Sequence, residues 1–160
     1  MKKNKLILGL IFLIGSTSCK SVDETTNLGS FLIFYQKSNS WIEYSYNANI
    51  DQNGKLSITE KSFVTNLSRE SEIDLPKEDL LSLKEKLNDL IAIELNENYG
   101  FDNDIAPTDY PTISIKYVTK NKIASTYVYG YDFIELPREL DSFLRAIEQV
   151  LLENDTIKNL

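Results

Sequence analysis

The sequence predicts an α+β fold with one antiparallel sheet of about five strands, in the order β-β-β-α-β-β-α, and two amphipathic helices packed on one face. Three observations support this prediction. Apolar and polar residues alternate in several segments that are separated by turn residues. Apolar residues recur at helical spacing in two other segments. The strand-to-strand connections are of hairpin length, which favours antiparallel pairing and leaves the second face of the sheet open.

The first half of the chain is predicted to be a three-stranded meander. A short apolar run covers residues 31–36, and residues 41–50 alternate with a period of two. A turn over 51–54 contains Asn and Gly, which tolerate positive φ, and a third strand returns over residues 55 to about 65. The residues assigned to one face of the second strand are Ile42, Tyr44, Tyr46, Ala48 and Ile50.

A helix is predicted over residues 76–93. Its apolar residues fall on one helical face, and they are Leu80, Leu83, Leu87, Leu90 and Ile91. Pro76 suits the first turn of this helix, and Glu78 and Asp79 suit the positive end of its dipole.

The second half continues with two strands and a closing helix. Residues 111–118 and 122–129 are predicted strands, joined by a tight hairpin over 119–121. After Pro137 the helical spacing returns, carried by Leu140, Phe143, Leu144, Ile147 and Leu151.

The segment over residues 96–110 shows neither a strand nor a helix pattern and is a candidate binding loop. Structureless loops of this length tend to be functional, or they pack as an Ω loop. The candidate binding residues are Tyr99, Phe101, Asp102, Asp104 and Asp109. In the alternative interpretation Tyr99 and Phe101 cap the helix and the sheet. A calcium site at this loop is disfavoured because Pro107 and Ile113 stand where an EF-hand needs Gly and Glu.

The composition argues against several classes of function. The chain has no histidine, one cysteine and no glycine-rich phosphate loop, so we predict a protein that is not an enzyme and holds no cofactor or metal. A formal charge of -7 argues against nucleic acid as a partner. A carboxylate-dependent hydrolase stays open as an alternative because Asp and Glu are plentiful. Nine tyrosines, most of them in predicted strands, fit either sheet packing or a binding face.

The N-terminus has the three parts of a secretory signal. Lys2, Lys3 and Lys5 precede a nine-residue apolar run over 6–14, and small residues follow it up to Cys19. Such a run is too short to span a bilayer. We therefore predict a removable signal over 1–18, a flexible tether over 19–30, one globular domain over 31–152 and a frayed tail over 153–160.

The residues Thr17, Ser18 and Cys19 resemble the lipobox of bacterial lipoproteins, although Ser16 stands where that motif commonly has Leu. This resemblance implies a diacylglyceryl group on the sulfur of Cys19 and an acyl chain such as palmitate on its amine. It also implies a location in the bacterial cell envelope, on the outer membrane, facing the periplasm or the cell surface. The protein would then be attached to the membrane through the lipid alone, and such an anchor is effectively permanent.

The stretches 109–115, 129–130 and 136–140 resemble a group of uncharacterised domains in bacterial envelope lipoproteins. The layout of a meander, a helix, a hairpin and a closing helix also resembles emfourin, an inhibitor of thermolysin-type metallopeptidases. The resemblance implies a non-catalytic module that binds a protein partner in the envelope. A peptidase inhibitor of the emfourin type is the alternative that it also implies.

Overall fold

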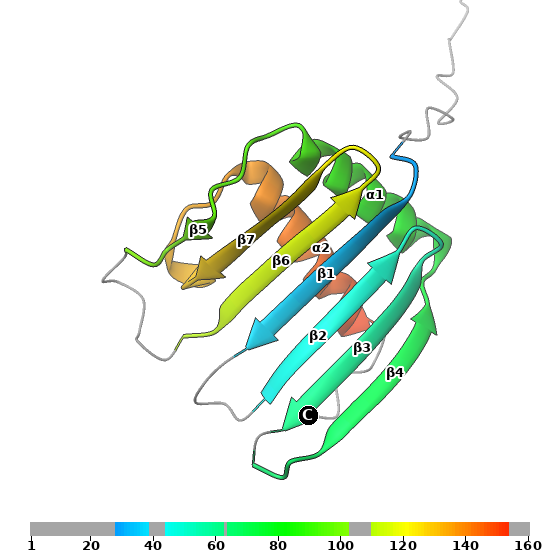
Figure 1. Ribbon diagram of the computed structural model, residues 1–160, viewed down its shortest axis with the longest axis vertical. Helices are drawn as coiled ribbons and strands as arrows, with labels where there is room; N and C mark the ends of the chain where they lie inside the picture. Colours follow the sequence, from blue (N-terminus) through cyan, green and yellow to red (C-terminus); the bar gives the residue numbers. More distant parts are fainter. Residues whose placement is uncertain (1–27, 39–43, 63, 103–109, 154–160) are drawn as a thin grey trace, which may run out of the picture.

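The structure, a computed structural model, describes residues 28–38, 44–62, 64–102 and 110–153. The predicted signal, almost all of the tether and the tail after residue 153 lie outside these residues. The described chain has a mixed α+β fold, in which a seven-stranded sheet is covered on one face by two helices (Figure 1). Its elements are β1 (Phe31–Ser38), β2 (Tyr44–Asp51), β3 (Lys55–Ser62), β4 (Ser68–Asp74), α1 (Lys77–Ile91), β5 (Asn98–Tyr99), β6 (Thr112–Thr119), β7 (Ile123–Tyr129), the 3-10 turn η1 (Tyr131–Phe133) and α2 (Arg138–Glu153).

The strands lie in the order β4-β3-β2-β1-β6-β7-β5. β1 is the central strand, antiparallel to β2 on one side and to β6 on the other. Ile33 faces Ile50 across one pairing and Tyr117 across the other, so the helix-facing side chains form rows across the sheet. The pairing of β5 with β7 is parallel, and the other pairings are antiparallel.

The prediction of about five strands was wrong, because it missed the two edge strands, β4 and β5. β4 carries Glu70, Glu72 and Asp74 on one face and only Ile73 as an apolar residue on the other, so it lacks the alternation of a half-buried strand. An edge strand buries little surface, and charged side chains there discourage further pairing. β5 is only two residues long and leaves no pattern in the sequence.

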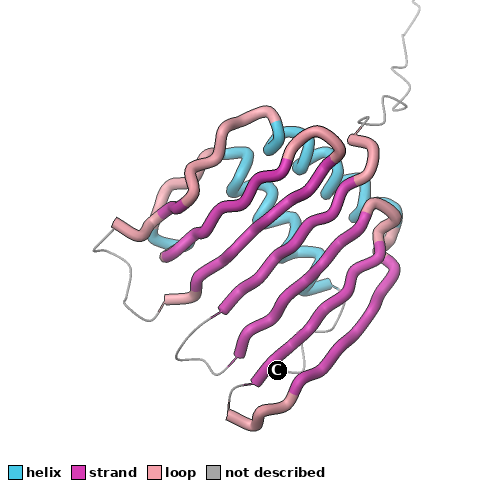
Figure 2. Tube along the Cα trace, in the orientation of Figure 1, coloured by secondary structure: helices cyan, strands magenta, loops and turns pink. Residues whose placement is uncertain are grey.

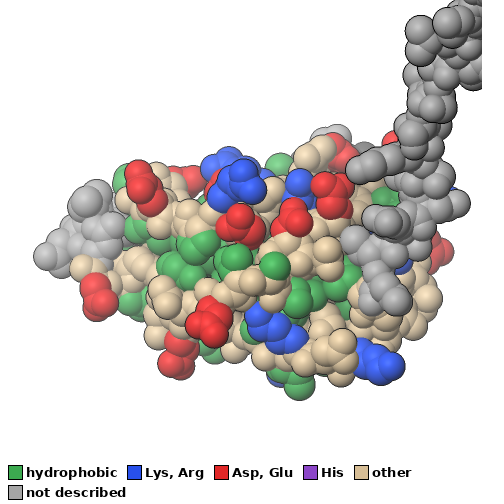
Figure 3. Space-filling view, turned by 90° about the horizontal axis from the view of Figure 1, so that it is seen from above, with side chains coloured by type: hydrophobic (Ala, Val, Ile, Leu, Met, Phe, Trp, Pro, Cys, Tyr) green, Lys and Arg blue, Asp and Glu red, His purple; other side chains and the backbone are tan. Residues whose placement is uncertain are grey.

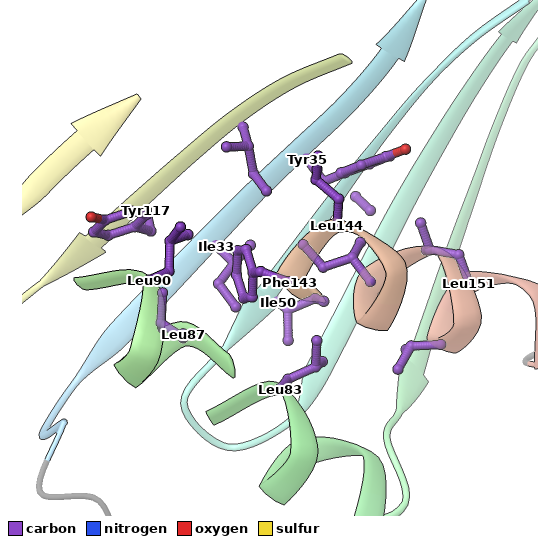
Figure 4. Close-up of a cluster of buried hydrophobic side chains, with 14 of the residues drawn as sticks. Ile33, Tyr35, Ile50, Leu83, Leu87, Leu90, Tyr117, Phe143, Leu144 and Leu151 are labelled. Carbon is purple, nitrogen blue, oxygen red and sulfur yellow. The ribbon is translucent and has the colours of Figure 1, made fainter. Parts of the chain in front are cut away.

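The core lies between the sheet and the helix layer. Ile33 and Ile50 of the sheet face Leu87 of α1 and Phe143 of α2 (Figure 4), and all four side chains are fully buried. The apolar residues predicted for the helix after Pro137 are all buried. Each such side chain contributes about 1.5 to 3 kcal/mol by leaving water.

The helix α1 has charged groups at both ends that suit its dipole. Pro76 precedes it, and its first turn carries Glu78 and Asp79, as predicted. At the other end, Lys122 Nζ donates hydrogen bonds of 2.8 Å to the carbonyl oxygens of Ile91 and Ile93. The ammonium of the β6–β7 turn thus caps the negative end of the helix. Neither helix of the described chain is long and apolar enough to cross a membrane.

The helix α2 is joined to the central strand by a partly buried polar cluster. Glu148 accepts hydrogen bonds of 2.9 Å from the Tyr35 hydroxyl and from Lys37 Nζ. The ring of Tyr46 lies beside that of Tyr35, with centroids 5.8 Å apart. Burial raises the pKa of Tyr35, and it raises the pKa of Tyr46 to about 12, so both hydroxyls stay protonated at neutral pH.

Candidate functional site

The described part of the predicted binding loop lies at the β5 edge of the sheet. Tyr99 is half-buried, whereas Phe101 and Asp102 are exposed. Asp104 and Asp109, like Cys19, lie outside the described residues. The structure thus places three of the five predicted loop residues near one another and leaves the other two untested.

The loop contains a strand, which corrects the prediction that it has none. Asn98 and Tyr99 pair with β7 in parallel, and the chain around them runs along the edge of that strand (Figure 2). The backbone N–H of Tyr127 donates to the carbonyl of Glu97 at 3.0 Å. The Tyr99 hydroxyl accepts a hydrogen bond of 3.1 Å from the backbone N–H of Asn96, so Tyr99 helps to hold the loop.

Gly100 allows the loop to approach β7 closely. Its φ is +81°, and a Cβ at this position would lie 2.0 Å from the carbonyl oxygen of Tyr129. Only glycine fits such a contact. The turn brings the ring of Phe101 to 5.6 Å from the ring of Tyr129, centroid to centroid.

The turn at Gly100 and Phe101 forms one wall of a surface hollow, and the segment that follows β7 forms the other wall. Gly130 has a φ of +66° and begins the short turn η1, in which the N–H of Phe133 donates to the Gly130 carbonyl at 2.8 Å. The ring of Tyr110 packs edge-on against Phe133, with centroids 5.0 Å apart, and its hydroxyl donates to the Asp132 carboxylate. This hydrogen bond raises the pKa of Tyr110 to about 12, so the hydroxyl stays a donor at neutral pH.

Between the two walls lies a surface hollow of about 390 Å³, which we name the aromatic–acidic hollow. Its lining residues are Asn98, Gly100, Phe101, Asp102, Phe133, Ile134 and Glu135. Phe101 is 53% exposed and Phe133 is 43% exposed, so two large apolar rings face solvent in the same hollow. The charged lining residues are both carboxylates, so the hollow combines apolar contact area with negative charge.

The two buried polar atoms of the described chain that lack a hydrogen-bond partner are far from each other in the sheet. Glu60 Oε1 and the Tyr117 hydroxyl are buried without a hydrogen-bond partner in the described residues, but they lie on β3 and β6, with β2 and β1 between them. No three acidic or cysteine side chains of the described chain are grouped so that they could hold a metal ion. The face of the molecule that Figure 3 shows carries charges of both signs with apolar side chains between them.

The tyrosines divide between the two faces of the sheet. Tyr35 and Tyr117 are buried, and Tyr46 is half-buried beside Tyr35, so these three serve packing against the helices. Tyr127, 44% exposed, projects from the open face. The expected tyrosine-bearing open face is therefore limited to β7, because strand alternation directs Tyr46 and Tyr117 inward.

Sequence reasoning missed a polar hollow on the open face. Gln36, Asn47, Asn49 and Ser114 line it, together with Phe34 and Lys116. Each belongs to the polar half of an alternating strand, which was the available signal. Their adjacency depends on the strand register, which the sequence pattern did not specify.

These features define a small two-layer α+β domain. Residues 45–151 match the family model described as a domain of unknown function, DUF6438. Because this match covers more than half of the chain, the chain belongs to that family, and the expected resemblance to an uncharacterised domain is confirmed. The matched region runs from β2 to the end of the buried part of α2. No curated protein matches the chain.

Proposed function

We propose that this protein is a lipid-anchored lipoprotein of the bacterial cell envelope whose domain binds a protein partner without catalysing a reaction. The observation that carries the proposal is the pair of exposed rings, Phe101 and Phe133, that line a hollow beside two carboxylates. Aromatic residues are enriched at protein interfaces because a rigid ring buries a large area at a small cost in side-chain entropy. A hollow between two such rings favours an inserted side chain.

The charge of the hollow indicates the chemistry of the partner. Asp102 and Glu135 belong to its lining, and Asp132 lies on the adjacent turn η1. Removal of residues 1–18 would leave 14 basic and 24 acidic side chains, a formal charge of 14 minus 24, or -10. Opposite charge speeds association and excludes acidic competitors. A partner that presents a basic segment with an apolar side chain fits both features.

The proposal is tested by capture from envelope extract with the full-length protein as bait. Phe101→Ala and Phe133→Ala together should remove the captured partner, because rings of this kind contribute most of the energy of an interface. Leu67→Ala is the matched control, because Leu67 is 70% exposed in the turn between β3 and β4. Asp102→Asn with Glu135→Gln should slow association and reduce its dependence on salt.

Two results would contradict a binding role for the hollow. One is capture of the same partner by the double phenylalanine variant and by the control. The other is the absence of any partner under gentle conditions. If the captured partner is a metallopeptidase that the protein slows stoichiometrically, the binding role takes the form of emfourin-type inhibition. Turnover of a hydrolase substrate that is lost on replacing one carboxylate would instead favour an enzyme.

The anchor part of the proposal rests on Cys19 and is tested separately. Replacement of Cys19 by Ala removes the sulfur to which the lipid would attach, so the variant should take up no labelled palmitate and should remain as an unprocessed precursor. The wild-type protein should be labelled and should fractionate with the outer membrane. A wild-type protein without label, or with a mature N-terminus other than Cys19 by mass spectrometry, would refute the anchor and leave the binding role to be judged by capture.

A further inference from the structure

A second hollow, of about 310 Å³, lies at the centre of the open sheet face, on the opposite side from the helices. Its lining comes from the three central strands and includes Tyr35, whose side chain is directed to the helix layer. The other six lining residues, two from each strand, face the open side. We name these six residues the amide grid, and they are Asn47, Asn49, Phe34, Gln36, Ser114 and Lys116.

The strand register arranges the amide grid in two rows. Gln36 is paired with Asn47 on one side and with Ser114 on the other, and Phe34 is paired in the same way with Asn49 and Lys116. With strands about 4.8 Å apart and alternate residues about 6.7 Å apart, the grid measures roughly 10 Å by 7 Å. The central strands fix the backbone positions from which these six side chains project.

The polar groups of the amide grid are available to a ligand. None of its three amides makes a hydrogen bond with another side chain of the described residues. Each amide offers two donor hydrogens and an acceptor oxygen from one plane. The half-buried ring of Phe34 stands between Asn49 and Lys116 in its row, with Lys116 Nζ 5.8 Å from its centroid. The lining contains no carboxylate, although the chain has 24 acidic residues.

We propose that the amide grid binds a neutral glycan. Sugar hydroxyl and acetamido groups both donate and accept hydrogen bonds, as Asn47, Asn49, Gln36 and Ser114 do, and the C–H face of a sugar ring packs on an aromatic ring such as Phe34. An apolar ligand would bury these amides unpaired, at about 1 to 3 kcal/mol for each group. A polyanion would find one ammonium, Lys116, within the grid.

The row of Asn47, Gln36 and Ser114 continues across the sheet, which allows a ligand longer than one sugar. Thr59 of β3 is paired with Asn47, and Tyr127 of β7 is paired with Ser114. Neutral hydrogen-bonding side chains therefore extend over five neighbouring strands, about 19 Å from the first to the fifth. A glycan strand that crosses the β-strands would meet such a group at each of them.

The test measures binding of two soluble oligosaccharides to the full-length protein by titration calorimetry. Chitotetraose carries acetamido groups and maltotetraose carries only hydroxyls. A polyoxyethylene detergent keeps the protein soluble without adding a competing sugar. We expect saturable binding of at least one oligosaccharide, with amide chemical-shift changes concentrated in β2, β1 and β6. Preference for chitotetraose would assign the amides to acetamido groups, and equal binding would assign them to hydroxyls.

Variants of the amide grid distinguish binding at this site from non-specific binding elsewhere on the protein. Asn47→Ala with Asn49→Ala should weaken binding at least tenfold, and Asn47→Asp, which keeps the shape but exchanges donors for a charged acceptor, should also weaken it. Gln52→Ala is the matched control, since it removes an exposed amide from the turn that follows β2. Equal affinity in the grid variants and the control, or no binding of either sugar, would overturn the proposal. Neither result depends on the aromatic–acidic hollow.

Discussion

The hydroxyl group of Tyr35 donates a hydrogen bond of 2.9 Å to the carboxylate of Glu148 and so joins the central strand to α2. The ring of Tyr35 is only 1% exposed, and Lys37 donates to the same oxygen atom from the more exposed side. A carboxylate that is partly removed from water loses solvation, and these two donors replace it.

Tyr35→Phe should destabilise the fold by about 1 to 3 kcal/mol, because it removes a donor from a partly buried carboxylate and leaves the ring in place. Urea unfolding should show a lower midpoint with an unchanged slope. Tyr127→Phe is the matched control, because Tyr127 is 44% exposed, and its midpoint should hardly move. Equal midpoints for the two variants would show that the Tyr35 hydroxyl contributes nothing.

Gly100→Ala should destabilise the β5 edge far more than Gly29→Ala. Both glycines have positive φ, at +81° and +62°, which costs an alanine about 1 to 2 kcal/mol. A Cβ at Gly29 meets nothing within 4 Å, whereas at Gly100 it would lie 2.0 Å from a backbone oxygen. Hydrogen exchange should report loss of protection at the Tyr127 amide only in Gly100→Ala. Similar protection in both variants would refute the close approach.

Lys122→Met should loosen the last turn of α1 and lower stability by about 1 to 2 kcal/mol, because the two carbonyls that Lys122 satisfies lose a charged donor. Amide exchange near Ile91 should accelerate. Lys120→Met, at an exposed position of the same turn, should leave both measurements unchanged. A stability loss in Lys120→Met as large as that in Lys122→Met would mean that the ammonium at this position has no specific role.

Asp141 should give the fold a pH-dependent contribution. Hydrogen bonds from Arg145, and then from Tyr131, hold the pKa of Asp141 below its usual range. A carboxyl with a lower pKa in the folded state stabilises the fold above its unfolded pKa, about 3.9, and this contribution is lost as the pH falls through the folded pKa. Asp141→Asn should cost about 1 kcal/mol or less at pH 7, and its difference from wild type should shrink below pH 4. A difference that stays constant from pH 7 to pH 3 would exclude this linkage.

The sequence was most informative where one face of an element carries all of its apolar residues. The predicted core positions of α2, from Leu140 to Leu151, are buried because helical spacing alone determines that face. Leu83, Leu87 and Leu90 of α1 are buried for the same reason.

The hydrophobic pattern of the sequence could not predict which distant elements pair with each other. Nothing local connects Tyr35 with Glu148, and the neighbours of Gln36 across the sheet depend on which strands pair with β1. The candidate loop was predicted from its length alone, and its parallel pairing with β7 depends on the close approach that Gly100 allows. β4 was missed because its surface is polar on both faces except at Ile73.

The polar surface of β4 has a consequence for how the molecule meets its own copies. A free sheet edge presents unpaired N–H and carbonyl groups that can template the growth of fibrils. Two copies that approach edge to edge along β4 would bring the carboxylates of Glu70, Glu72 and Asp74 of each into one row, in which Glu72 is paired with the ammonium of Lys55 at 2.8 Å. At the opposite edge, β5 offers two residues for pairing. The charged surface of one edge and the shortness of the other therefore both disfavour growth of the sheet from one copy to the next.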